Sequence, residues 1–139
     1  MILYNHCSNR LLEWMTALMM IFIAVIVAVN PKTIEFGGFY LMRDIGLTAE
    51  VLGALFMACG WVRIVALFAN GHWPVYGPRF RAACALMGAV IWTQMLLALT
   101  AWSTKSGYIS IGVAVYFFLT VGELISCYRA AADVRTNDR

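Results

Sequence analysis

Hydrophobic and polar positions divide this chain into four long apolar runs separated by short, more polar segments. Each run is close to the roughly 20 residues that a helix needs to cross a hydrocarbon core about 30 Å thick. The pattern predicts an all-α integral membrane protein, with four transmembrane helices in an antiparallel bundle and a single domain over 1–139. The expected helices cover about 11–29, 49–70, 82–102 and 108–128.

Turn-forming and capping residues mark the ends of these runs. Asn30-Pro31 stops the first run, because proline cannot continue a helix. Thr48 is a suitable N-cap for the second run, and Glu50 follows in the first turn, where the helix dipole favours negative charge. The first run is longer than the apolar part of a usual signal peptide, so we expect a retained helix.

The composition also indicates a bilayer. The chain is 63% hydrophobic and 12% charged, against about 45–50% and about 25% in soluble domains. Its formal net charge of +3 requires no nucleic-acid partner. The lipid bilayer is therefore the expected surrounding.

Lysine and arginine residues are unequally distributed between the two sides of the expected bundle. Six of them lie in the N-terminal segment, the second connection and the C-terminal tail: Arg10, Arg79, Arg81, Arg129, Arg135 and Arg139. Three lie in the other two connections: Lys32, Arg43 and Lys105. Because basic residues favour the cytoplasmic side, we expect both termini in the cytoplasm, with 30–48 and 103–107 outside.

The second connection, GHWPVYGPRFR at 71–81, predicts a rigid turn at the cytoplasmic interface. Its prolines stop either helix from continuing. Trp73 and Tyr76 suit the headgroup layer, and Arg79 and Arg81 suit lipid phosphates. A docking loop for a cytoplasmic partner is the alternative interpretation.

The first connection is not simply hydrophilic. Five apolar or aromatic residues flank Gly37-Gly38: Phe36, Phe39, Tyr40, Leu41 and Met42. They predict a loop anchored in the outer headgroup layer, as a short interfacial helix or a re-entrant segment.

Three charged residues fall inside the expected spans and form a candidate intramembrane cluster. At 1.5 Å of rise per residue, Glu13, Arg63 and Glu123 all lie within about 10 Å of the same interface. An arginine facing lipid at a helix centre costs roughly 2.5–3.5 kcal/mol, so we expect Arg63 to pair with Glu123 or Glu13 inside the bundle. The first interpretation is a structural ion pair, and the alternative is a proton- or ion-handling site.

Small and polar residues recur at helical spacing and predict the faces where helices pack. In the second span these residues are Gly53, Gly60, Arg63 and Asn70, and in the fourth they are Gly112, Tyr116, Thr120 and Glu123. The third span offers Cys84 with Gly88, and Ala85 with Ala89. Gln94, near the middle of that span, is expected to hydrogen-bond to another helix.

No motif for an enzyme, metal or cofactor accompanies these features. His6 and His72 lie outside the spans without a second ligand set, and the four cysteines lack paired spacing. A glycine-rich phosphate loop, a nucleophile elbow and an HExxH sequence are all missing. We therefore expect a protein that is not an enzyme and has no cofactor and no metal.

The stretch WVRIVALFANGHWPVYGPRFRAACALMGAVIWTQ, Trp61 to Gln94, resembles small uncharacterised membrane proteins of tailed bacteriophages and prophages. The similarity rests on an arginine in one helix, an Asn-Gly turn, a Pro-Arg pair near the next helix and a later tryptophan, here Arg63, Asn70-Gly71, Pro78-Arg79 and Trp92. It covers about a quarter of the chain. The resemblance implies a bacterial inner-membrane location and holin-like or host-envelope roles, with no defined active site.

Two functions follow from these observations. The first is a non-enzymatic membrane protein that works by self-assembly or by association with a membrane partner, through the small-residue faces. The alternative is a small proton- or ion-coupled transporter that uses Glu13, Arg63 and Glu123. Assembly predicts that Gly60→Leu is not tolerated, whereas transport predicts that Glu123→Gln abolishes flux.

Overall fold

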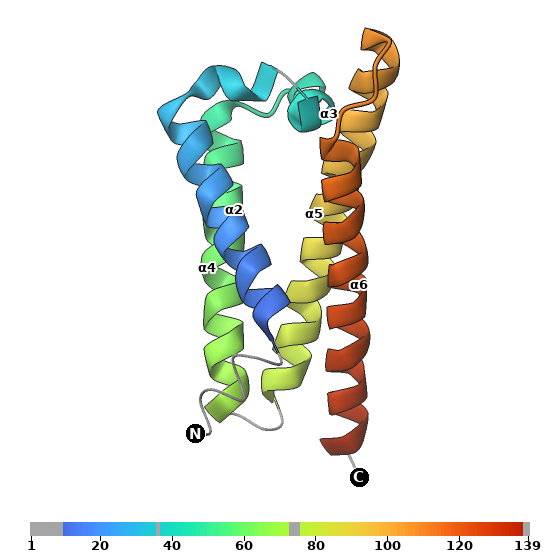
Figure 1. The fold of residues 1–139 in the computed structure, drawn as a ribbon. Coiled ribbons are helices and arrows are strands. Elements are labelled where there is room, and N and C mark those ends of the chain that lie inside the picture. Colours follow the sequence, from blue (N-terminus) through green and yellow to red (C-terminus); the bar gives the residue numbers. More distant parts are fainter. Residues whose placement is uncertain (1–9, 36, 73–75, 138–139) are drawn as a thin grey trace.

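The computed structural model of this chain describes residues 10–35, 37–72 and 76–137. Within these ranges, four helices are long and apolar enough to cross a membrane. They are α2 (Leu11–Val29), α4 (Ala49–His72), α5 (Tyr76–Ser106) and α6 (Gly112–Asn137). The chain is thus an all-α, multi-pass membrane protein whose long helices form a bundle (Figure 1).

The bundle has two distinct ends (Figure 1). At one end α2 and α5 begin and α4 and α6 end, and we call it the charged end because ion pairs gather there. The opposite end, which we call the capped end, carries the short elements η1 (Pro31–Glu35), η2 (Gly37–Phe39) and α3 (Tyr40–Asp44). Helix α2 packs mainly on α4, and α5 packs mainly on α6. Helices α4 and α5 join these two pairs, whereas α2 and α6 touch little.

Two helices are longer than the apolar pattern predicts. Helix α5 begins at Tyr76 rather than near residue 82, and it contains Pro78 in its first turn. Proline is tolerated there because an N–H group in the first turn has no partner within the helix. Helix α5 continues through Ser106 to a turn at Gly107, whose φ of 76° favours glycine. Helix α6 continues to Asn137, past the expected end near residue 128.

The segment over the capped end forms short helices, which was one of the predicted alternatives, but Phe39 and Met42 pack into the protein core and not into lipid headgroups. Phe39 is 6% exposed and Met42 is 9% exposed. The Phe39 ring meets the Phe56 ring of α4 edge-on, with centroids 5.8 Å apart. A Cβ atom on Gly38 would lie 3.0 Å from the Met95 side chain, so this segment sits tightly on α5. Phe36 lies outside the described residues.

The apolar core occupies the half of the bundle next to the capped end. Its most deeply buried large side chains come from α2, α4 and α5: Met20, Val27, Leu52, Phe56, Trp92 and Met95. Trp92 also stacks on Tyr116 of α6, with ring centroids 6.0 Å apart. Many apolar side chains of the long helices are exposed on the outside of the bundle, which is the arrangement expected where lipid is the solvent.

Candidate functional site

The first ion pair of the charged end joins α4 to α6. The Arg63 guanidinium donates two hydrogen bonds to the Glu123 carboxylate, with Nη1 2.5 Å from Oε1 and Nη2 2.8 Å from Oε2. The two side chains are 3% and 1% exposed. This parallel, two-bond geometry is the strongest that arginine makes with a carboxylate. The structure therefore brings together two of the three charged residues that the sequence places inside the spans.

Gly88 of α5 makes room for this pair. A Cβ atom at Gly88 would lie 2.2 Å from Arg63 Nη1 and 2.9 Å from the carboxyl carbon and one carboxylate oxygen of Glu123. No side chain fits at those distances, so α5 can lie against the pair only where it presents a glycine. The small residue that the sequence assigns to helix packing thus accommodates a charged contact.

The second ion pair joins α2 to α5 and involves a residue expected elsewhere. Arg81 Nε lies 2.9 Å and 3.1 Å from the two carboxylate oxygens of Glu13, and its Nη1 lies 2.7 Å from Asp133 Oδ2 of α6. Arg81 is 5% exposed. The expectation that Arg81 contacts lipid phosphates from a loop is wrong, because the residue lies inside α5 and is neutralised by two acidic side chains.

Arg10 adds a third cation beside the second pair. It precedes α2, and burial, followed by repulsion from Arg81, lowers its pKa, while attraction from Glu13 and Asp133 acts in the opposite direction. Arg10, Arg63 and Arg81 thus lie near the carboxylates of Glu13, Glu123 and Asp133. We call Glu13, Arg63, Arg81, Glu123 and Asp133 the charge cluster.

A small cavity separates the two ion pairs. Glu13, Arg63 and Arg81 line it together with Cys84 and three apolar residues, and its volume is about 10 Å³. That is close to the minimum of about 10–15 Å³ that one water molecule requires. The cluster thus contains space for a single water and for no larger ligand.

The buried carboxylates of the charge cluster are already paired with arginines, and this limits what else they can bind. The Glu123 carboxylate accepts two hydrogen bonds from Arg63, and the two carboxylate oxygens of Glu13 share the single Nε–H of Arg81. Their oxygens are therefore already engaged with cations of the same chain. In the described ranges, no group of three or more histidine, cysteine or acidic residues could hold a metal ion. His6 and Cys7 lie outside those ranges.

The other glycines of the predicted packing faces contact different neighbouring helices. Gly60 faces α2, where a Cβ atom would lie 3.0 Å from the Ala17 carbonyl oxygen and 2.5 Å from the Ile21 side chain. Gly53 also faces α2, but at ordinary contact distances of 3.7–3.8 Å. Gly112 faces Leu99 of α5, at 2.7 Å. These glycines therefore pack helices within one chain.

The other candidate residues lie apart from the cluster. Gln94 is exposed on the outside of α5, away from the neighbouring helices of its own chain. The Thr120 hydroxyl donates to the Tyr116 carbonyl oxygen of its own helix, 2.9 Å away. Tyr76 is 70% exposed in the first turn of α5, and Arg79 is exposed in the same helix. Trp73 lies outside the described residues.

Sequence reasoning missed Arg81 and Asp133 as members of the cluster. Pro78 predicts a later start for this helix, which places Arg81 in the preceding loop. Asp133 lies beyond the apolar run, yet it continues the buried stripe Glu123, Ser126 and Ala130 at helical intervals of three and four residues. Extending that periodicity past the end of the apolar run would have found it.

Comparison with known proteins adds no relative from which a role can be transferred. No family model, no curated protein sequence and no solved structure matches this chain.

Proposed function

We propose that this protein is a non-enzymatic bacterial inner-membrane protein that acts by assembling with copies of itself or with another membrane protein. One observation carries the proposal: the intramembrane charges pair within a single chain, and the outside of the bundle is left apolar. An internally neutral bundle needs no partner to neutralise it. Its contacts with other proteins are then made by side-chain packing at the lipid-exposed surface.

The resemblance of residues 61–94 to phage and prophage membrane proteins narrows this proposal to a holin-like or host-envelope role. A holin-like protein would assemble into lesions that let solutes cross the membrane. Since Gly53, Gly60 and Gly112 pack helices within the chain, the assembly surface lies elsewhere on the bundle. A Gly60→Leu variant consequently tests folding rather than assembly.

A transporter is the second candidate, favoured by one feature. Glu13, Arg63 and Arg81 line a common cavity, so a proton could pass between buried groups there. The size of the cavity and the occupied carboxylates weigh against transport of anything larger than a proton or water.

The test combines the mass of the protein in nanodiscs with dye release from liposomes that contain it. Large assemblies and dye release support the holin-like role, whereas discrete oligomers in sealed liposomes support association without lesions. A strict monomer with proton flux that Glu123→Gln abolishes would overturn assembly and establish transport. Gln94→Ala is the control for the flux measurement, because it removes an exposed polar side chain outside the cluster.

A further inference from the structure

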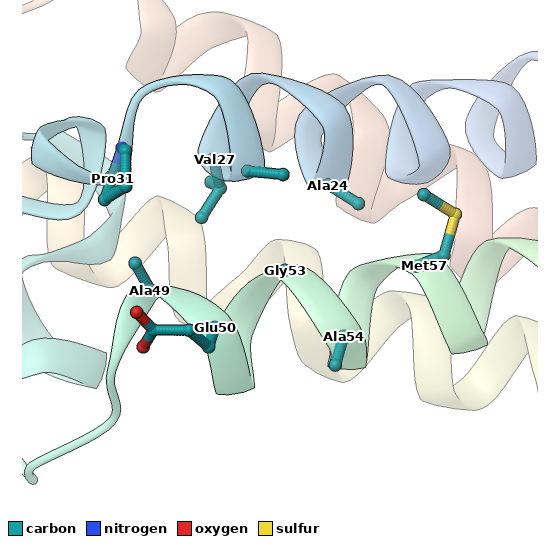
Figure 2. Close-up of a pocket in the computed structure, with 9 residues that line it drawn as sticks. Ala24, Val27, Pro31, Ala49, Glu50, Gly53, Ala54 and Met57 are labelled. Atoms are coloured by element: carbon teal, nitrogen blue, oxygen red, sulfur yellow. The ribbon is translucent and has the colours of Figure 1, made fainter.

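A groove between α2 and α4 lies next to the capped end of the bundle (Figure 2). Its volume is about 400 Å³. The walls are formed largely by short apolar side chains, with Ala24 and Ala28 on α2 and Ala49, Gly53 and Ala54 on α4. Among the described residues that line the groove, Glu50 alone is charged.

The groove is present because α2 and α4 approach each other more closely near the charged end than near the capped end. Near the charged end, a Cβ atom on Gly60 would lie 3.0 Å from the Ala17 carbonyl oxygen. Toward the capped end, a Cβ atom on Gly53 would lie 3.7 Å from the Ala24 carbonyl oxygen. The helix backbones therefore separate toward the capped end, and alanine and glycine side chains are too short to fill the space.

Glu50 places a negative charge at the rim of the groove. It lies in the first turn of α4, and its side chain is exposed. Figure 2 shows its carboxylate beside Ala49, on the part of the groove nearest Pro31. The apolar span of α4 begins at Ala49, so we expect the carboxylate at the level of lipid headgroups. A long apolar cavity below a single carboxylate is complementary to an amphiphile with a cationic head.

We propose that this groove binds phosphatidylethanolamine, with one acyl chain between α2 and α4 and the primary ammonium group on the Glu50 carboxylate. The ammonium group donates hydrogen bonds to a carboxylate, which the choline headgroup cannot do, and Glu50 repels an anionic phosphatidylglycerol headgroup.

The dimensions of the groove favour a lipid chain over a protein helix. The α2 wall extends from Ala24 to Pro31, which is about 10 Å at 1.5 Å per residue. A helix of that length and about 10 Å in diameter occupies roughly 800 Å³, about twice the volume of the groove. A polymethylene chain is narrow enough for its part nearest the headgroup to lie within the groove.

The test is native mass spectrometry of the full chain released from nanodiscs that contain equal amounts of phosphatidylethanolamine, phosphatidylglycerol and phosphatidylcholine. The wild type retains phosphatidylethanolamine over each of the other lipids by roughly threefold to fivefold, the preference expected from one exposed ion pair. Glu50→Gln removes this preference, and Gly53→Leu, which places a side chain between α2 and α4, removes the retained lipid. Glu35→Gln and Ala58→Leu leave both unchanged, because these exposed residues do not line the groove.

Three results would overturn the proposal. The first is retention of the three lipids in their bulk ratio by the wild type. The second is an unchanged amount of bound lipid in Gly53→Leu and also in Ala28→Leu, which adds a side chain to the other wall of the groove. The third is a loss of oligomer mass in these variants without a loss of lipid, which would assign the groove to another protein chain. Unfolding of each variant in detergent is compared with that of Ala58→Leu, so that a folding defect is recognised.

Discussion

Arg63 Nη1 and Nη2 lie 2.5 Å and 2.8 Å from the two carboxylate oxygens of Glu123, in a contact from α4 to α6 that lies against Gly88 of α5. Both side chains are almost fully buried. Two charges in this position compensate each other only while both are present, because either alone would be an unpaired charge in a medium of low dielectric constant. The contact therefore joins the two helix pairs of the bundle.

Removing one partner of this pair is expected to cost more stability than removing both. Glu123→Leu lowers the free energy of unfolding by about 3–5 kcal/mol, since it leaves Arg63 unpaired. The double variant Arg63→Met with Glu123→Leu recovers most of that loss, because apolar side chains replace the whole pair. Unfolding in mixed detergent micelles measures both values. A double variant no more stable than Glu123→Leu would contradict this account of the pair.

Gly88 should tolerate no added methyl group, whereas Gly53 should tolerate one. Gly88→Ala forces its Cβ against the Arg63 guanidinium and destabilises the protein by about 1–3 kcal/mol, the usual cost of overpacking. Gly53→Ala meets α2 at ordinary contact distance and gains helix propensity, so its unfolding free energy is unchanged or higher. Equal losses in the two variants, measured by thermal unfolding, would argue against the packing at Gly88.

The two acidic partners of Arg81 should contribute unequally. Glu13 is buried, and Glu13→Gln lowers the free energy of unfolding by about 3 kcal/mol, as expected when a buried ion pair loses one charge. The Asp133 side chain is 49% exposed, so Asp133→Asn costs at most about 1 kcal/mol. The comparison is made by unfolding in detergent at constant ionic strength. An Asp133→Asn variant less stable than Glu13→Gln would reverse the assigned roles.

The stability of the segment over the capped end should depend on the Phe39 side chain. Phe39→Ala removes a ring buried against Phe56 and costs about 3–5 kcal/mol. Ile45→Ala, also in the segment over the capped end, changes the free energy of unfolding by less than about 0.5 kcal/mol, because Ile45 is 78% exposed. Hydrogen exchange at the backbone amides of Gly38 and Met42 reports whether the segment opens in Phe39→Ala. Protection as in the wild type would show that the segment stays closed without the ring.

The apolar pattern predicted the spans well and the short elements poorly. The first helix ends at Asn30-Pro31 as expected, since a turn-forming dipeptide directly follows the last apolar residue. The burial of Phe39 was not predictable, because an aromatic residue suits a headgroup layer and a protein core equally well. Its position is decided by contacts with α4 and α5, which lie far away in the sequence.

The sequence predicted that the charge cluster exists, but it identified only some of the residues that form it. An unpaired arginine inside an apolar span is unfavourable, so Arg63 was expected to pair with an acidic residue at the same depth. The choice among those partners depends on which helix faces which neighbour. In the structure Glu123 pairs with Arg63, whereas Glu13 pairs with Arg81.

The Arg63–Glu123 pair also has a consequence for biosynthesis, since its members are 60 positions apart in the chain. At about 5–20 residues per second, the ribosome adds Glu123 roughly 3–12 s after Arg63. During that interval α4 enters the bilayer with its arginine unmatched by Glu123, and the long side chain can reach the headgroups by extending along the helix. The contact with Glu123 can form only after α6 has been synthesised, so the pairing of Arg63 is expected to follow the insertion of α4 rather than accompany it.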